Sequence, residues 1–162
     1  MRGYGKDSER IELRGKLDSL NAGIIMLQAN SDSQEYIADL EEVRAVVNQL
    51  QRCEAGEKIF EGSIILWGLD GEELHRRSHN PSKFFGKGHI LPHHEMGREA
   101  AGLNFLRTMI RECELCAVRA FGSEDSLRIC HVLNRLSSAV YVLTYKYLPK
   151  DYSREIRFGS SE

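Results

Sequence analysis

The chain has 162 residues, of which 41% are hydrophobic and 28% charged, a composition typical of one folded domain and not of a disordered segment. Its formal net charge of −2 provides no basic field that would recruit nucleic acid or a membrane surface. No apolar run reaches the length of a membrane span, and the polar N-terminus contains no signal-peptide core.

Helical periodicity fills the first third of the chain. Apolar residues recur at spacings of three and four over Ile11–Asn30 and again over Gln34–Cys53, which predicts two amphipathic helices. Asp7 or Ser8 is the candidate N-cap of the first helix, and Asn30–Ser33 (NSDS) is typical of a turn that caps the second. The charged outer face of the second helix indicates a position on the outside of a bundle.

Residues 54–94 interrupt this pattern. Asp70–Glu73 (DGEE) is a capping box that predicts a brief helix to about Ser78, and Asn80-Pro81 ends it. The following segment, Phe84–Pro92, is aromatic, glycine-containing and irregular. A connection of this length without periodicity is often functional.

Two further helices are predicted in the second half. Glu95–Phe121 has apolar residues three and four apart, and Gly122-Ser123 can end this helix and cap a last one that runs to about Leu148. Four long helices and one short helix predict an all-α, up-and-down five-helix bundle over residues 1–150. The polar residues 151–162 predict a flexible tail.

Arg107, Arg111 and Glu114 lie at i, i+4 and i+7, so they share one face of a helix beside its apolar stripe. They form either an ion-pair ladder at a helix interface or a pair of fixed guanidiniums that binds an anion. Asp18 of the first helix is a natural acidic partner for one arginine, and Asn134, on a leucine-rich face, can orient a ligand. Because the sequence has no P-loop and no dinucleotide fingerprint, an anion site has to be built from side chains.

Two sets of residues have the chemistry of metal ligands. Cys113 and Cys116 have C-x-x-C spacing but lie inside a helix with no second pair, so we expect reduced, buried thiols of a cytoplasmic protein. His93, His94 and Glu95 could bind a metal, although such residues are more often exposed loop or capping groups. We therefore predict no resident metal site.

Six stretches of the sequence resemble one known family. Four of them, taken in chain order, are similar to the G-x-x-D-E-L-N, F-x-L-P-G-G, R-x-x-x-R-R-x-E and N-R-L-S-D motifs of ATP:cob(I)alamin adenosyltransferases of the propanediol-utilisation type. Two further stretches look closer to the ethanolamine-utilisation corrinoid adenosyltransferases, and the resemblance covers about Lys6 to Leu148. The four motifs are Gly15–Asn21 (GKLDSLN), His89–Pro92 (HILP), Arg107–Glu114 (RTMIRECE) and Leu133–Ser137 (LNRLS), and the two stretches are Gly68–Pro81 (GLDGEELHRRSHNP) and Gly97–Arg107 (GREAAGLNFLR).

This resemblance implies a five-helix bundle that assembles as a homotrimer with active sites between subunits. It implies transfer of the adenosyl group of ATP, with Mg²⁺, to the cobalt of cob(I)alamin and release of triphosphate. A flavoprotein reductase and an adenosylcobalamin-dependent enzyme are the expected protein partners, and the cytoplasm or a bacterial microcompartment is the expected location. Such a reaction needs positioning and stabilisation of charge on a leaving group more than acid–base chemistry.

The resemblance also assigns site residues. Those matching the catalytic positions are Arg107, Arg111 and Asp18, with an ion pair between an arginine and Asp18. Those matching the ATP site are Lys6, Glu12, Arg107, Arg111, Glu114 and Asn134. Those assigned to cobalamin are His89, Phe84, Phe85, Leu91 and Asn134, where His89 stands at a position that is Phe in the wider family and Phe84 and Phe85 are candidates for an apolar wall.

The sequence departs from the family pattern at several charged positions. Ser19, Glu112 and Ser138 replace a Glu, an Arg and an Asp. The family's N-terminal T-K-T-G-D nucleotide loop and the His/Cys metal cluster of the ethanolamine type have no counterpart in this sequence, which is compatible with a short variant or with weakened ATP binding. The alternatives are a non-catalytic corrinoid-binding or cobalamin-delivery protein and a purely structural helical bundle.

Overall fold

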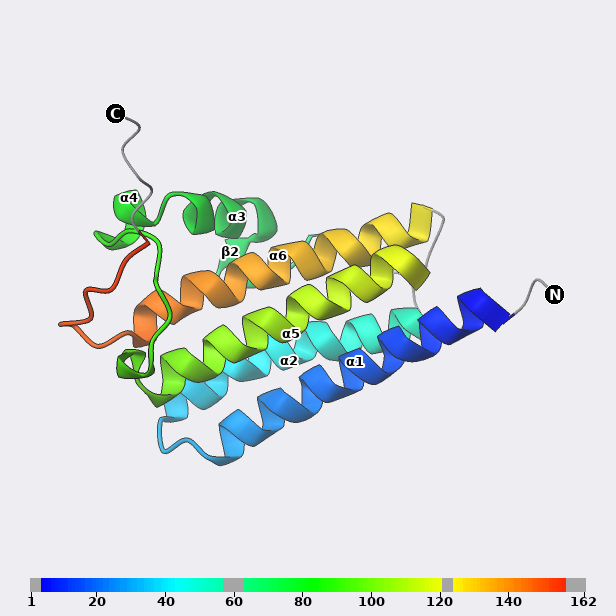
Figure 1. The fold of residues 1–162 in the computed structure, drawn as a ribbon, viewed down its shortest axis with the longest axis horizontal. Helices are drawn as coiled ribbons and strands as arrows, with labels where there is room; N and C mark the ends of the chain where they lie inside the picture. Colours follow the sequence, from blue (N-terminus) through cyan, green and yellow to red (C-terminus); the bar gives the residue numbers. More distant parts are fainter. Residues whose placement is uncertain (1–3, 57–62, 121–123, 157–162) are drawn as a thin grey trace.

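The computed structural model describes residues 4–56, 63–120 and 124–156, with side chains from residue 8 in the first segment and from residue 128 in the last. Within these residues, four long helices run side by side as an up-and-down bundle (Figure 1). α5 packs against α1 and α6, and α2 packs against α1. The all-α prediction is therefore confirmed. The long helices are α1 (Tyr4–Ala29), α2 (Gln34–Glu54), α5 (Arg98–Ala120) and α6 (Glu124–Tyr147).

Smaller elements connect α2 to α5. The strands β1 (Ile65–Leu66) and β2 (Leu69–Asp70) form a two-stranded hairpin, followed by α3 (Gly71–His79), α4 (Pro81–Phe85) and the 3₁₀ turn η1 (His94–Met96). α3 packs along α6, on the outside of the bundle (Figure 1). α6 therefore lies between α5 and α3.

Side-chain caps set two of the helix starts as predicted. Ser33 Oγ accepts a hydrogen bond from the Tyr36 amide at 3.2 Å, and Asp70 Oδ1 accepts one from the Glu73 amide at 2.8 Å. Pro81 ends α3 but also opens α4, because proline is compatible with the first turn of a helix.

Other predicted helix ends were wrong. α1 begins at Tyr4, so Asp7 and Ser8 lie inside it, because apolar spacing marks the buried part of a helix and not its end. α5 begins only at Arg98, since Gly97, with φ 83°, separates it from η1. The predicted cap at Gly122-Ser123 lies outside the described residues.

The apolar stripes of the four long helices meet in one core. Gly102 on α5 shows how closely the helices approach, because a Cβ there would lie 2.7 Å from Leu27 Cδ2 and 3.0 Å from the Tyr36 hydroxyl. Cys113 is buried in this core, and burial raises the pKa of its thiol to about 12. Fully buried members of the core include Leu13, Leu17, Leu20, Ile24, Leu40, Leu103, Leu106, Ile110, Leu133 and Leu136.

Residues 151–156, the first part of the predicted flexible tail, are hydrogen-bonded to the His89 segment. The Ile156 amide donates to His89 O at 2.8 Å, and the Leu91 amide donates to Arg154 O at 3.1 Å. Tyr152 is 7% exposed, and its hydroxyl donates to the Leu91 carbonyl. These contacts use both the backbone and the side chains of the segment, so its polar composition alone did not indicate them. Residues 157–162 lie outside the described part of the chain.

Within the described residues, no helix is both long and apolar enough to cross a bilayer.

Candidate functional site

A cavity of about 320 Å³ lies between α5, α6, α3, the loop around His89 and the C-terminal segment. This volume falls at the lower end of small-molecule sites. Two arginines line the cavity, and none of the described lining residues is acidic, so its charge favours an anion. The lining residues are Ser78 and His79 from α3, Asn104, Arg107 and Arg111 from α5, Ser137, Ser138, Tyr141 and Thr144 from α6, and His89, Ile90, Pro92, Met96 and Ile156.

Arg107 is an arginine of this cavity with a buried donor that is not satisfied. Its Nε has no hydrogen-bond partner among the described residues, and its Nη2 donates to Asn104 Oδ1 at a long 3.4 Å. Its guanidinium carbon lies 6.0 Å from the centroid of the Tyr141 ring. Among the described residues, no carboxylate pairs with it. A partly buried guanidinium with unused donors beside a cavity is suited to an anionic ligand.

Arg111 and Glu114 pair with each other one turn further along α5. Arg111 Nε lies 3.7 Å from Glu114 Oε2, and Asn134 Nδ2 donates to Glu114 Oε1 at 3.1 Å. Glu114 Oε2 is buried and accepts no hydrogen bond among the described residues. The ladder interpretation therefore applies to Arg111 and Glu114 but does not extend to Arg107.

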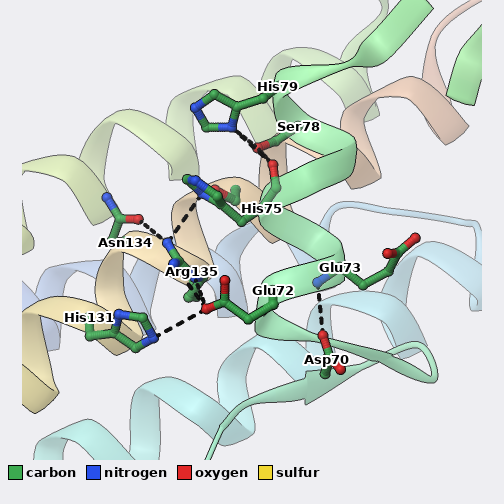
Figure 2. Close-up of polar contacts among 10 residues, drawn as sticks. Asp70, Glu72, Glu73, His75, Ser78, His79, His131, Asn134 and Arg135 are labelled. Atoms are coloured by element: carbon green, nitrogen blue, oxygen red, sulfur yellow. Dashed lines mark hydrogen bonds and ion pairs between the residues drawn. The ribbon is translucent and has the colours of Figure 1, made fainter. Parts of the chain in front are cut away.

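Figure 2 shows Arg135 of α6 between Asn134 and the side chains of α3. Its Nη1 donates to Asn134 Oδ1 at 2.8 Å and to His75 Nδ1 at 3.2 Å, while Nε donates to Glu72 Oε1 at 3.0 Å. An arginine can only donate and a carboxylate can only accept, so the Asn134 amide must direct its oxygen to Arg135 and its nitrogen to Glu114. The network thus fixes the orientation of a predicted site residue.

The same contacts perturb two titratable groups on α3. Burial, followed by the positive charge of Arg135, lowers the pKa of His75. The hydrogen bond from Arg135 lowers the pKa of the Glu72 carboxyl. Since Arg135 donates to His75 Nδ1, the neutral imidazole of His75 carries its proton on Nε2.

His89 lies in the same cavity as the two arginines. Its Nδ1 is 3.1 Å from the Tyr141 hydroxyl, and its ring stacks on Tyr141 at an interplanar angle of 18°. Leu91, two residues on, is 47% exposed and is not among the lining residues. The HILP motif therefore contributes His89, Ile90 and Pro92 to the cavity.

Phe84 and Phe85 are not among the described residues that line the cavity. The Phe84 ring lies 4.7 Å from the guanidinium of Arg76. Phe85 stacks on Tyr145, with ring centroids 4.4 Å apart, and packs against the main core. Their role as an apolar wall for cobalamin stays a prediction.

The structure does not bring the residues of α1 to this cavity. Asp18 is exposed, lines a groove between α1 and α2, and forms no ion pair with Arg107 or Arg111 within the chain as described. Glu12 Oε1 accepts a hydrogen bond from Cys116 Sγ at 3.5 Å. The Lys6 side chain lies outside the described residues. Spacing places a residue on a helix face but does not tell which neighbour that face meets.

One triad of potential metal ligands is present near the start of α5. One ligand atom each of His93, His94 and Glu95 lies within 4.8 Å of the others. Arg154 Nε, however, donates to Glu95 Oε2 at 2.7 Å and neutralises that carboxylate. The absence of a resident metal stays a prediction.

Sequence reasoning missed the contribution of α6 to the cavity. Ser137, Ser138, Tyr141 and Thr144 all line it, although only Asn134 on this helix had been assigned a role. The available signal was a second row of polar residues, three and four apart, beside the leucine stripe.

The sequence is similar to known proteins over most of its length. The family model described as cobalamin adenosyltransferase matches residues 2–147. The chain is 39% identical over 145 residues to corrinoid adenosyltransferase EutT of Escherichia coli K12, covering 85% of this chain and 52% of the relative. It is 37% identical over 142 residues to the corrinoid adenosyltransferase EutT of Salmonella typhimurium, covering 85% and 52%. The chain thus spans about half the length of these relatives. No solved structure matches.

Proposed function

The chain belongs to the cobalamin adenosyltransferase family, and from this membership we propose that it transfers the 5′-deoxyadenosyl group of ATP to cob(I)alamin. The products are adenosylcobalamin and triphosphate. The observation that carries the proposal is the family match over residues 2–147. This range includes Arg107, Arg111 and His89, which line the cavity.

The cavity has groups suited to this reaction. The cobalt of cob(I)alamin attacks C5′ of the ribose, the C5′–O bond breaks, and its electron pair leaves with the triphosphate. The buried, unsatisfied Nε of Arg107 and the guanidinium of Arg111 can donate to that leaving group as its negative charge develops. Their positions are set by the rigid helix α5, so little reorganisation is needed at the moment of reaction.

Glu114 and Asn134 form the second part of the proposed ATP site. The buried Oε2 of Glu114 accepts no hydrogen bond among the described residues, and carboxylate oxygens are preferred ligands of Mg²⁺. Asn134, whose amide orientation is fixed by Arg135 and Glu114, can present a constant polar edge to the substrate. Mg²⁺ would reduce the charge of the bound triphosphate.

Assembly is proposed to complete the site. Asp18 has no partner arginine among the described residues of its own chain, and it lies on an exposed side of α1. Exposed large apolar side chains are also present on α1 and α5, an arrangement that suits packing against further copies. A homotrimer, in which Asp18 of one copy meets an arginine of the next, accounts for both features. The apolar residues are Ile11, Ile25, Met26, Phe105, Leu115 and Val118.

The remaining assignments rest on the family alone. Lys6 and Glu12 are proposed to border the nucleotide, and Phe84, Phe85 and Leu91 to contact the corrinoid. We also propose a flavoprotein reductase as the source of cob(I)alamin, an adenosylcobalamin-dependent enzyme as recipient of the product, and the cytoplasm or a bacterial microcompartment as the location.

The test is an anaerobic assay with the protein, ATP, Mg²⁺ and chemically reduced cob(I)alamin. Replacement of the cob(I)alamin absorption band by the adenosylcobalamin spectrum is the expected result. The matched control is an ATP analogue in which the oxygen between C5′ and the triphosphate is replaced by a methylene group. Because the C5′–O bond that breaks in the reaction is missing, the cob(I)alamin band should stay unchanged.

Two other outcomes separate the alternatives. Cobalamin binding without an ATP-dependent product would support a corrinoid-binding or delivery protein. Binding of neither ligand would support a purely structural bundle, in which the arginines of α5 serve only packing.

A further inference from the structure

Two tyrosines one turn apart on α6 hold the backbone and the ring of the His89 segment. The Tyr145 hydroxyl donates to Gly88 O at 2.8 Å and lies 3.0 Å from the Tyr141 hydroxyl. The Tyr141 oxygen accepts a hydrogen bond from the Ile90 amide at 3.1 Å and lies 3.1 Å from His89 Nδ1. Neither tyrosine was assigned a role by the sequence motifs.

Only one arrangement of protons satisfies all four contacts. Gly88 O is a carbonyl and can only accept, so the single proton of Tyr145 is directed to it. Tyr145 must then accept from Tyr141 and thereby uses the single proton of Tyr141. The Tyr141 oxygen is left as an acceptor, first for the Ile90 amide and second for His89 Nδ1–H.

We propose that Tyr141 and Tyr145 are positioning residues that fix neutral His89 as its Nδ1–H tautomer in the candidate site. The lone pair of the ring then resides on Nε2. In a neutral imidazole this is the atom that accepts a hydrogen bond or ligates a metal ion. The relay therefore determines which edge of His89 can act as an electron-pair donor toward a bound substrate.

The C-terminal segment holds the same loop from the other side. The Ile156 amide donates to His89 O at 2.8 Å, and Glu155 Oε1 accepts from the Gly88 amide at 2.9 Å. The main chain of Gly88 and His89 is thus bonded both to α6 and to the tail. Because both sides fix the backbone, the Cα and Cβ atoms of His89 keep a constant position relative to Tyr141.

Nitrogen-15 NMR of the histidine side chains tests the tautomer directly and requires no activity. In the wild-type protein at alkaline pH, we expect the proton on Nδ1 of His89, with the signal assigned by its loss in His89→Gln. In Tyr145→Phe the Tyr141 hydroxyl loses its acceptor, so its proton should turn to His89 Nδ1 and the tautomer should invert to Nε2–H. Tyr141→Phe should likewise remove the preference for Nδ1–H.

The matched control is Tyr147→Phe, which removes a hydroxyl from the same helix outside the relay, where it donates to Asp39 Oδ2 at 2.6 Å. It should leave the His89 tautomer unchanged. A wild-type proton on Nε2, or a Tyr145→Phe variant that keeps the wild-type tautomer, would overturn the proposal.

Use of this tautomer by a corrinoid rests on the proposed function and needs a separate measurement. In the anaerobic assay, Tyr145→Phe should raise the KM for cob(I)alamin several-fold while leaving the KM for ATP unchanged. If the NMR result holds and the wild-type protein makes no adenosylcobalamin, the proposed function fails and the tautomer assignment stands. Equal changes in both KM values would overturn the role of the relay in corrinoid positioning.

Discussion

Two arginines on facing helices differ in how far the protein satisfies them. Arg135 on α6 is 14% exposed and donates hydrogen bonds to Glu72, Asn134 and His75, all within 3.2 Å. Within the described residues, Arg107 on α5 has a buried Nε without a partner and one long bond to Asn104. Both lie in the same part of the bundle, so the difference arises from the acceptors that surround them and not from depth alone.

This difference separates a structural guanidinium from one suited to a ligand. A buried donor without an acceptor costs free energy of folding, so its retention needs a compensating interaction in the bound state. Arg135 has that compensation in the folded chain. Arg107 lacks it among the described residues, and it lines a cavity. If this distinction holds, loss of Arg135 should act mainly on stability and loss of Arg107 mainly on turnover.

Arg107→Ala should have the largest effect. Loss of a donor aimed at the leaving triphosphate should reduce kcat at least about 10²–10³-fold, as for other donors that stabilise developing charge. Stability should stay within about 1 kcal/mol of wild type, because an unpaired buried charge is removed. The measurements are turnover by corrinoid absorbance and chemical denaturation.

A stability loss as large as the one predicted below for Arg135→Ala would contradict this assignment of Arg107, as would retained turnover. Arg107→Lys sharpens the test, since it keeps the charge and removes the planar set of donors. We expect it to recover only part of the lost activity.

Arg111→Ala should have a smaller effect on turnover. Its side chain is 59% exposed and already lies 3.7 Å from Glu114, so solvent and this carboxylate weaken its contribution to an anion. We expect the KM for ATP to rise by about one order of magnitude, equivalent to roughly 1.4 kcal/mol, with a small change in kcat. Initial rates at varied ATP measure it, and an effect equal to that of Arg107→Ala would remove the distinction between the two cations.

Arg135→Ala should act first on stability. It leaves Asn134 Oδ1 without its Arg135 donor and His75 Nδ1 with only the 3.5 Å contact to Ser138 Oγ, and loss of such bonds costs about 1–3 kcal/mol. The matched control is Arg44→Ala, which breaks an exposed pair with Glu41 on α2 and should cost less stability. Urea denaturation compares them, and equal costs would show that the Arg135 network adds nothing to an ordinary surface pair.

The sequence predicted the long helices well because their cores repeat at helical spacing. Leu103, Leu106 and Ile110, for example, are each 0% exposed on the face expected from their positions. The start of α1 and the position of Asp18 were not predictable in the same way, since periodicity reports burial and not helix ends or neighbouring helices. Arg107 and Arg111 were singled out because charges beside a buried stripe are unusual, and both line the cavity.

The cavity walls depended on contacts between distant segments. Tyr152 binds the Leu91 carbonyl, and Ile156 binds His89, across more than sixty residues of chain. Backbone pairing of two irregular segments leaves no periodic signal, so the tail was taken for a flexible one. Tyr141 and Tyr145 were missed because a tyrosine beside an apolar stripe is usually a core residue, and only the loop they contact reveals their hydroxyls as a relay.

The smallest predicted effect concerns pH and tests whether the charge of Arg135 reaches His75. Burial and Arg135 lower the pKa of folded His75 below its usual 6.5, and Glu72 partly opposes this shift, while His79 and His131 add to it. The unfolded chain therefore binds more protons at His75 than the folded one below pH 6.5, so the free energy of unfolding should fall as the pH decreases through that value.

His75→Gln should make this dependence shallower, and Arg135→Ala should do so to a lesser extent because burial remains. If wild type and Arg135→Ala show the same dependence in urea titrations over this range, the guanidinium does not act on His75. The contrast between Arg135 and Arg107 would then rest on hydrogen bonding alone.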